Sequence, residues 1–148
     1  MNTIRIQSEP FDVCAESEAL TKSCADVGAL VTFVGLVRRD DGLISLSLEH
    51  YSEMTEREIA RHVDEARSRW PLLGTTVIHR VGRLEPGDPI VFVGVASSHR
   101  NAAFAAAEFL MDYLKTRAPL WKQEERASGN AWVEAKSSDD AAATRWQK

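Results

Sequence analysis

The chain has 148 residues, of which 44% are hydrophobic, and it carries a formal net charge of -4. This length is sufficient for one hydrophobic core and does not require a second domain. The acidic balance argues against a general nucleic-acid-binding protein, which needs a basic excess to neutralise phosphates, so any anion site must be local.

The first third of the chain predicts three short strands and one helix. Apolar and polar residues alternate over 4–6, which indicates a strand, and Asp12 is a suitable N-cap for a helix that follows it. A β-rich apolar run over 29–34 and a period-two pattern over 44–48 indicate two more strands. The Asp-Asp-Gly segment 40–42 predicts a hairpin turn between them.

The middle of the chain predicts one helix and then two strands. Thr55 and Glu58 have the spacing of a capping box, and Pro71 ends the amphipathic pattern that follows. Residues 75–84 and 90–97 are predicted to be strands joined by a Pro-Gly turn. Because the second of these is apolar throughout, we expect it to be central in the sheet.

The last third predicts a long helix and two short strands. Ser98 is placed to cap an Ala-rich helix over 99–116, and extended pieces follow at 120–124 and 131–134. A polar, Ala-rich tail begins at about residue 136. The order of elements describes a single α+β domain with a mostly antiparallel sheet and packed helices.

Basic residues gather at the ends of the predicted elements, where functional sites form. His99 and Arg100 open a helix, where free backbone N–H groups and the helix dipole favour a phosphate or a carboxylate. A surface ion pair would explain Arg100 equally well. Lys115 complements the dipole at the end of that helix without any functional role, and Lys122 follows Trp121 in a short extended segment. If the two lysines converge, their mutual repulsion makes one amine easier to deprotonate.

Several common motifs are absent from the sequence. It contains no phosphate-binding loop, nucleophile elbow or His-Glu-x-x-His motif, and its four histidines lack metal-ligand spacing. Cys14 and Cys24 have neither redox nor zinc spacing, and both they and His79 are interpreted as structural residues. We therefore expect no metal and no cofactor. The N-terminus lacks a signal-peptide pattern and no segment is apolar enough to span a membrane, which predicts a cytoplasmic protein.

A series of short blocks, in order and at matching spacing, resembles the large subunit of molybdopterin synthase. The similarity covers most of the chain and is strongest over 28–134. The blocks are Phe33 to Arg38, Leu48 to Tyr51 with Met54, His79 to Gly82, Ser98 to Arg100 with Ala103 and Phe104, Asp112 to Lys115, Ala118 to Lys122, and Trp132 with Val133.

The resemblance implies a fold, a reaction and an assembly. The fold is an α/β hammerhead-type domain over residues 1–148, and the enzyme is a sulfurtransferase of molybdenum cofactor biosynthesis. Two sulfurs pass in succession from the thiocarboxylated Gly-Gly C-terminus of a small ubiquitin-like sulfur-carrier subunit to cyclic pyranopterin monophosphate, forming the molybdopterin dithiolene. A homodimer of the large subunit carries one small subunit on each protomer, which makes a heterotetramer. Because sulfur arrives on the partner, no catalytic cysteine is needed.

The resemblance also implies the site residues. Lys115 and Lys122 match the catalytic lysines, and the expected substrate-binding residues are Arg38, His99, Arg100, Lys115, Lys122, Gln123 and Glu124. Leu36 and Gln123 stand where relatives often carry a basic residue, and Lys136 stands where some have arginine, which leaves these auxiliary contacts open.

Helix geometry adds a constraint on this site. His99 and Lys115 are 16 residues apart on one predicted helix, or about 24 Å at about 1.5 Å per residue, too far for one small substrate to touch both. No Gly or Pro interrupts the helix, so we predict that the two ends serve one site from different protomers. The alternative to an enzyme is a non-catalytic module that binds an anion or a phosphorylated metabolite. An RNA-binding domain is disfavoured by the acidic charge and by an aromatic content of only 7%.

Overall fold

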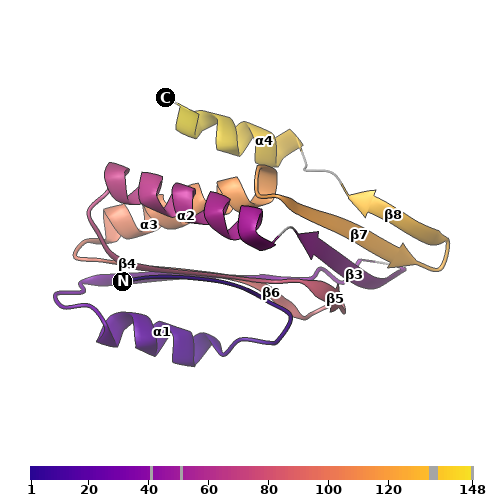
Figure 1. Cartoon of the computed structure of the whole chain (residues 1–148), viewed down its shortest axis with the longest axis horizontal. Helices are drawn as coiled ribbons and strands as arrows, with labels where there is room; N and C mark the ends of the chain where they lie inside the picture. Colours follow the sequence, from indigo (N-terminus) through magenta and orange to yellow (C-terminus); the bar gives the residue numbers. More distant parts are fainter. Residues whose placement is uncertain (41, 51, 134–136, 148) are drawn as a thin grey trace.

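The computed structural model describes residues 1–40, 42–50, 52–133 and 137–147, which form two four-stranded sheets and their covering helices (Figure 1). The strand order is β1-β4-β6-β2 in the first sheet and β5-β3-β7-β8 in the second. The strands are β1 (Asn2–Gln7), β2 (Ala29–Leu36), β3 (Leu43–His50), β4 (Leu72–Arg80), β5 (Gly82–Leu84), β6 (Pro89–Ser97), β7 (Leu120–Arg126) and β8 (Gly129–Val133). The helices are α1 (Val13–Lys22), α2 (Ser52–Arg69), α3 (Arg100–Thr116), α4 (Ser137–Thr144) and the 3₁₀ turn η1 (Arg145–Gln147).

The first sheet has helices on both faces, which explains its apolar central strand. Helix α1 covers one face, while α2 and α3 cover the other (Figure 1). On the α1 side Phe92 contacts Phe11, whereas Val93 of the same strand packs in the core beneath α2 and α3. Strand β6 lies between β4 and β2, so the predicted central position is confirmed. Among the strands that the structure describes, only the β1–β4 pair is parallel, and the predicted α+β class with mostly antiparallel pairing is also confirmed.

The prediction of one strand over 75–84 is wrong. Strand β4 ends at Arg80, and the chain leaves the first sheet at Gly82, whose φ of 88° is favourable only for glycine. The short strand β5 then pairs with β3 in the second sheet. One apolar stretch therefore contributes to both sheets.

The hairpin predicted at 40–42 is also wrong. The chain does turn there, because the backbone N–H of Leu43 donates to the carbonyl of Asp40 at 3.0 Å; Asp41 lies outside the described residues. However, β2 pairs with β6, and β3 pairs with β5 and β7. The turn thus carries the chain from one sheet to the other.

Two of the three predicted helix caps differ from the structure. Asp12 does cap α1, since its side chain accepts from the N–H of Ala15 at 3.0 Å. Helix α2 begins at Ser52, so Thr55 is not a cap; it is buried within the helix and donates to the carbonyl of Pro119. Helix α3 begins one residue later than predicted, with His99 rather than Ser98 in the cap position.

The C-terminal tail is folded rather than merely polar. Helix α4 lies against α3 (Figure 1), and η1 contacts α3 through Trp146. Trp146 packs edge-on against Trp70 and Phe109, with ring centroids 5.6 and 5.7 Å away, and its indole N–H donates to Asp112 at 2.6 Å. Among the described residues no helix is long and apolar enough to cross a membrane.

Candidate active site

A cavity of about 290 Å³ lies where the second sheet meets the C-terminal end of α3. Three basic and two acidic side chains line it together with an apolar wall. The charged residues are Arg38, Asp40, Lys115, Lys122 and Glu124, and the apolar ones are Leu36, Val37, Leu43, Leu46 and Val133. Neither cysteine belongs to the lining.

Three chain segments bring these charges together. Arg38 follows β2, where the neighbouring Val37 exchanges backbone hydrogen bonds with the turn before β6, at 2.8 and 2.9 Å. Lys115 lies in the last turn of α3. Lys122 lies on β7, in register with strands on both sides. Glu124 is two residues further along β7 and so points to the same face as Lys122.

The two lysines line one cavity, and both act electrostatically on the buried imidazole of His79. His79 is only 4% exposed, and burial lowers its pKa to about 4. The charges of Lys122 and Lys115 lower this pKa further, so both ammonium groups lie within electrostatic range of one ring. Nδ1 is 2.8 Å from the carbonyl of Arg80, which requires the ring proton on Nδ1 and leaves Nε2 as an acceptor.

The carboxylates of the cavity are held by a neighbouring arginine. Arg126 donates to Glu124 at 2.9 Å and lies 3.9 Å from Asp40. This pairing offsets the negative charge of the lining. The positive charges of Arg38 and the two lysines therefore dominate, and the cavity favours an anion.

The cavity does not include every residue predicted for the site. Gln123 points to the opposite face of β7 from Lys122 and is not part of the lining. His99 and Arg100 are exposed at the other end of α3, which runs without a break to Thr116. Arg100 is therefore about 22 Å from Lys115 along the helix axis. Lys136 lies outside the described residues.

Sequence reasoning missed the relation of His79 to the lysines. It interpreted His79 as a structural residue of a strand, and the residue is indeed buried there. No local signal places it near Lys115 and Lys122, because those residues come from α3 and β7 and meet β4 only in the folded chain. Within the described ranges, no cluster of three or more His, Cys, Asp or Glu side chains could hold a metal ion.

The fold and the cavity define a class: an α+β domain with an anion pocket in which two amines and a guanidinium converge. Amines in such a setting serve in proton transfer, nucleophilic attack and charge stabilisation. The family model described as "MoaE protein" matches residues 6–117, and the chain belongs to this family. The resemblance found from the sequence is thereby confirmed.

Relatives of known name agree with this assignment over nearly their full length. A "Molybdopterin synthase catalytic subunit" from Mesorhizobium japonicum is 58% identical over 148 residues, covering 98% of this chain and 93% of that protein. The Escherichia coli protein of the same name is 55% identical, with 97% of each chain covered. A solved structure of the "Molybdopterin biosynthesis MoaE protein" from Burkholderia ambifaria is 50% identical, with a TM-score of 0.87 and coverage of 100% of this chain and 99% of that one.

Proposed function

We propose that this protein is the catalytic subunit of molybdopterin synthase and transfers two sulfurs to cyclic pyranopterin monophosphate. The observation that carries the proposal is the convergence of Arg38, Lys115 and Lys122 in one pocket. These are the residues that match the family's functional positions. The names of relatives with more than half of their residues identical to this chain support the same activity.

The proposed chemistry divides the charged residues into two groups. Arg38 binds the anionic pterin, while Lys115 and Lys122 act on the thiocarboxylate that delivers sulfur. In each transfer the acyl carbon–sulfur bond breaks and water replaces sulfur on the acyl carbon to leave a carboxylate. On the pterin a carbon–sulfur bond forms in place of a carbon–oxygen bond, whose oxygen takes the bonding electron pair and leaves as water or stays on the phosphate. Amines can stabilise the oxyanion formed on the acyl carbon and can carry the protons that these bond changes require.

The proposal includes a partner and a location. The sulfur donor is a small ubiquitin-like subunit with a thiocarboxylated C-terminus, and the assembly is a homodimer of this chain with one small subunit on each protomer. The word "subunit" in the relatives' names agrees with such an assembly. We also propose that the reaction takes place in the cytoplasm.

We further propose that the site is shared between protomers. An unbroken α3 keeps Arg100 about 22 Å from Lys115 of the same chain, and His99 about 24 Å from it. In a twofold dimer, the start of α3 of one protomer would face the lysines of the other and complete its pterin site. His99 and Arg100 then act in trans, while Arg38, Lys115, Lys122 and Glu124 act in cis.

Complementation tests the shared site. Arg100→Ala and Lys115→Ala chains are mixed and the heterodimers isolated by two different affinity tags. If the site is shared, one pocket receives both substitutions and the other receives neither, so activity should return to roughly half of wild type. If Arg100 and Lys115 serve the same chain's pocket, every pocket keeps one lesion and the heterodimer stays inactive.

Reconstitution tests the function itself. Purified protein is combined with a thiocarboxylated small subunit and the pterin precursor, and the dithiolene product is measured. We expect product to form and to depend on Lys115 and Lys122. Binding of the precursor without any sulfur transfer would instead support the non-catalytic anion-binding module.

A further inference from the structure

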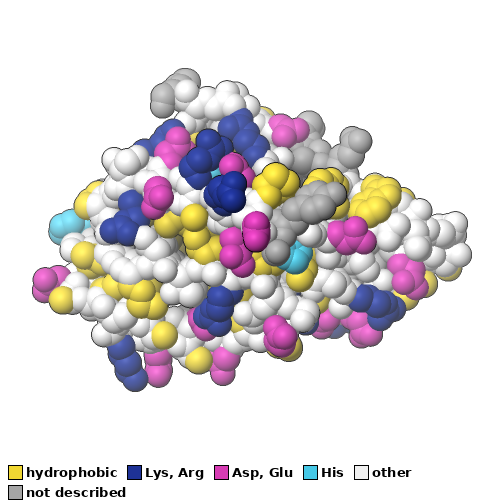
Figure 2. Space-filling view, viewed as in Figure 1, with side chains coloured by type: hydrophobic (Ala, Val, Ile, Leu, Met, Phe, Trp, Pro, Cys, Tyr) yellow, Lys and Arg dark blue, Asp and Glu magenta, His cyan; other side chains and the backbone are white. Residues whose placement is uncertain are grey.

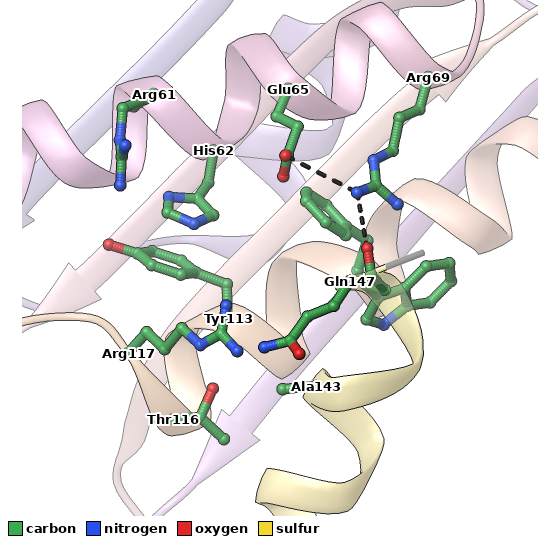
Figure 3. Close-up of a pocket in the computed structure, with 11 residues that line it drawn as sticks. Arg61, His62, Glu65, Arg69, Tyr113, Thr116, Arg117, Ala143 and Gln147 are labelled. Carbon is green, nitrogen blue, oxygen red and sulfur yellow. Dashed lines mark hydrogen bonds and ion pairs between the residues drawn. The ribbon is translucent and has the colours of Figure 1, made fainter.

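A second cavity, of about 370 Å³, lies between α2, α3 and the C-terminal segment of α4 and η1 (Figure 3). It shares no lining residue with the cavity of Lys115. Tyr113, Thr116 and Arg117 reach it from the last turn and C-cap of α3, on either side of Lys115 in the sequence. Its volume is in the range of small-molecule sites.

The lining of this cavity is basic although the whole chain is acidic. Arg61, Arg69 and Arg117 belong to the lining, and among the described residues Glu65 is its one acidic member; the carboxylate of Glu58, outside the lining, pairs with Arg61. Figure 2 shows Lys and Arg side chains gathered on this face, near α2 and α4. Arg69 is held in place, because it lies 3.7 Å from Glu65, donates to the carbonyl of Trp146 at 2.7 Å and stacks over Phe109.

The other two arginines are available for a ligand. The guanidinium of Arg117 has no ion pair or hydrogen bond within the part of the chain that the structure describes. The side chain of Arg61 pairs at 2.8 Å with Glu58 but is 71% exposed, so water screens this pair and an anion can compete for the guanidinium. In Figure 3 the guanidinium of Arg61 lies near the hydroxyl end of Tyr113, and that of Arg117 lies near the opposite end of the Tyr113 side chain.

The hydroxyl of Tyr113 is a hydrogen-bond donor without an acceptor among the described residues. The side chain is 5% exposed and stacks on His62 with ring centroids 3.4 Å apart. Its hydroxyl is buried and has no hydrogen-bond partner in the described structure. In Figure 3 the hydroxyl points toward the side of Arg61. Buried hydroxyl groups are normally satisfied, so this donor indicates a missing acceptor.

We propose that this cavity binds a planar organic anion, namely a ring that carries a phosphate or a carboxylate. The anionic group would lie between Arg61 and Arg117 and accept from the Tyr113 hydroxyl. The ring would pack toward Phe109 and Trp146, since the cavity is much larger than a lone phosphate and has aromatic walls. This site is independent of the proposed sulfur transfer and of the residues assigned to it.

Titration calorimetry with phenyl phosphate tests the proposal in the full-length protein. We expect saturable binding that Arg117→Gln weakens about tenfold or more, because a charge-assisted contact is lost. Two controls should leave this binding unchanged: Arg83→Gln, an exposed arginine on β5, and Arg38→Ala, which disables the other anion pocket. Loss of binding in Arg38→Ala with full binding in Arg117→Gln would assign the ligand to the other pocket and overturn the proposal.

Two further ligands test whether the site recognises the aromatic ring of phenyl phosphate as well as its phosphate. Inorganic phosphate should bind about tenfold more weakly than phenyl phosphate, and phenol should not bind measurably, because the site needs both parts of the ligand. Equal affinity for inorganic and phenyl phosphate would overturn the organic part of the proposal.

Tyr113→Phe separates a binding role from a structural one. Since the hydroxyl has no partner, its removal should leave the melting temperature of the free protein unchanged or raised. The increase in melting temperature that phenyl phosphate gives the wild type should shrink in this variant. A lower melting temperature of the free variant with an unchanged ligand effect would show that the hydroxyl is structural and would overturn its assignment.

Discussion

The buried His79 should make the stability of the folded chain depend on pH in a calculable way. Its pKa is about 4 in the folded protein and about 6.5 in an unfolded chain. Between these values the unfolded state binds more protons, so stability rises with pH. The stabilisation from a neutral His79 is fully present above pH 6.5 and is lost progressively as the pH falls toward 4.

The magnitude follows from the size of the pKa shift. A displacement from 6.5 to about 4 corresponds to about 3 kcal/mol over the whole window. Lowering the pH from about 7.5 to about 5 should therefore cost about 2 kcal/mol of unfolding free energy through this residue. Urea denaturation at the two pH values measures it.

A matched variant isolates the contribution of His79. In His79→Asn the amide nitrogen can replace Nδ1 as the donor to the carbonyl of Arg80, but the side chain cannot be protonated. Other titrating groups are the same in both proteins. The wild type should then lose about 2 kcal/mol more than the variant on acidification. Equal losses in the two proteins would refute the reasoning.

The remaining predictions concern catalysis, binding and packing. Lys115→Ala and Lys122→Ala should abolish sulfur transfer while circular dichroism shows an intact fold. Lys115→Arg should also be inactive, because a guanidinium cannot give up a proton. Near wild-type turnover in Lys115→Arg would show that Lys115 has only an electrostatic role. Arg38→Ala and Arg100→Ala should each raise the dissociation constant for the precursor about 10- to 100-fold in calorimetry, because a charge-assisted contact is lost. An unchanged dissociation constant would show that these arginines do not bind the precursor. Trp146→Ala should lower the unfolding free energy by about 2 kcal/mol, because a partly buried aromatic side chain and its hydrogen bond are lost; an unchanged urea midpoint would show that η1 does not stabilise the domain.

The sequence alone determined the features that depend on local pattern. An Ala-rich segment without Gly or Pro predicted an unbroken α3, and with it the separation of Arg100 from Lys115. The uniformly apolar residues of β6 predicted a central strand, and in the structure helices cover it on both faces. The ordered blocks predicted the family, because many short matches in register are hard to produce by chance. The resemblance, by contrast, implied Gln123 as a substrate-binding residue, whereas alternation along β7 points it away from the face of Lys122.

Only the tertiary structure decided which elements meet. A period-two pattern tells which face of a strand is buried but not which strand it pairs with, since pairing depends on backbone groups far away in the sequence. This is why β2 and β3 were expected in one hairpin and lie in different sheets. It is also why the sequence indicated only a polar, Ala-rich tail, although Trp146 in that tail packs against Trp70 and Phe109, which are distant in the sequence. The convergence of Lys115 and Lys122 beside His79 has the same origin: three elements meet there through non-local packing.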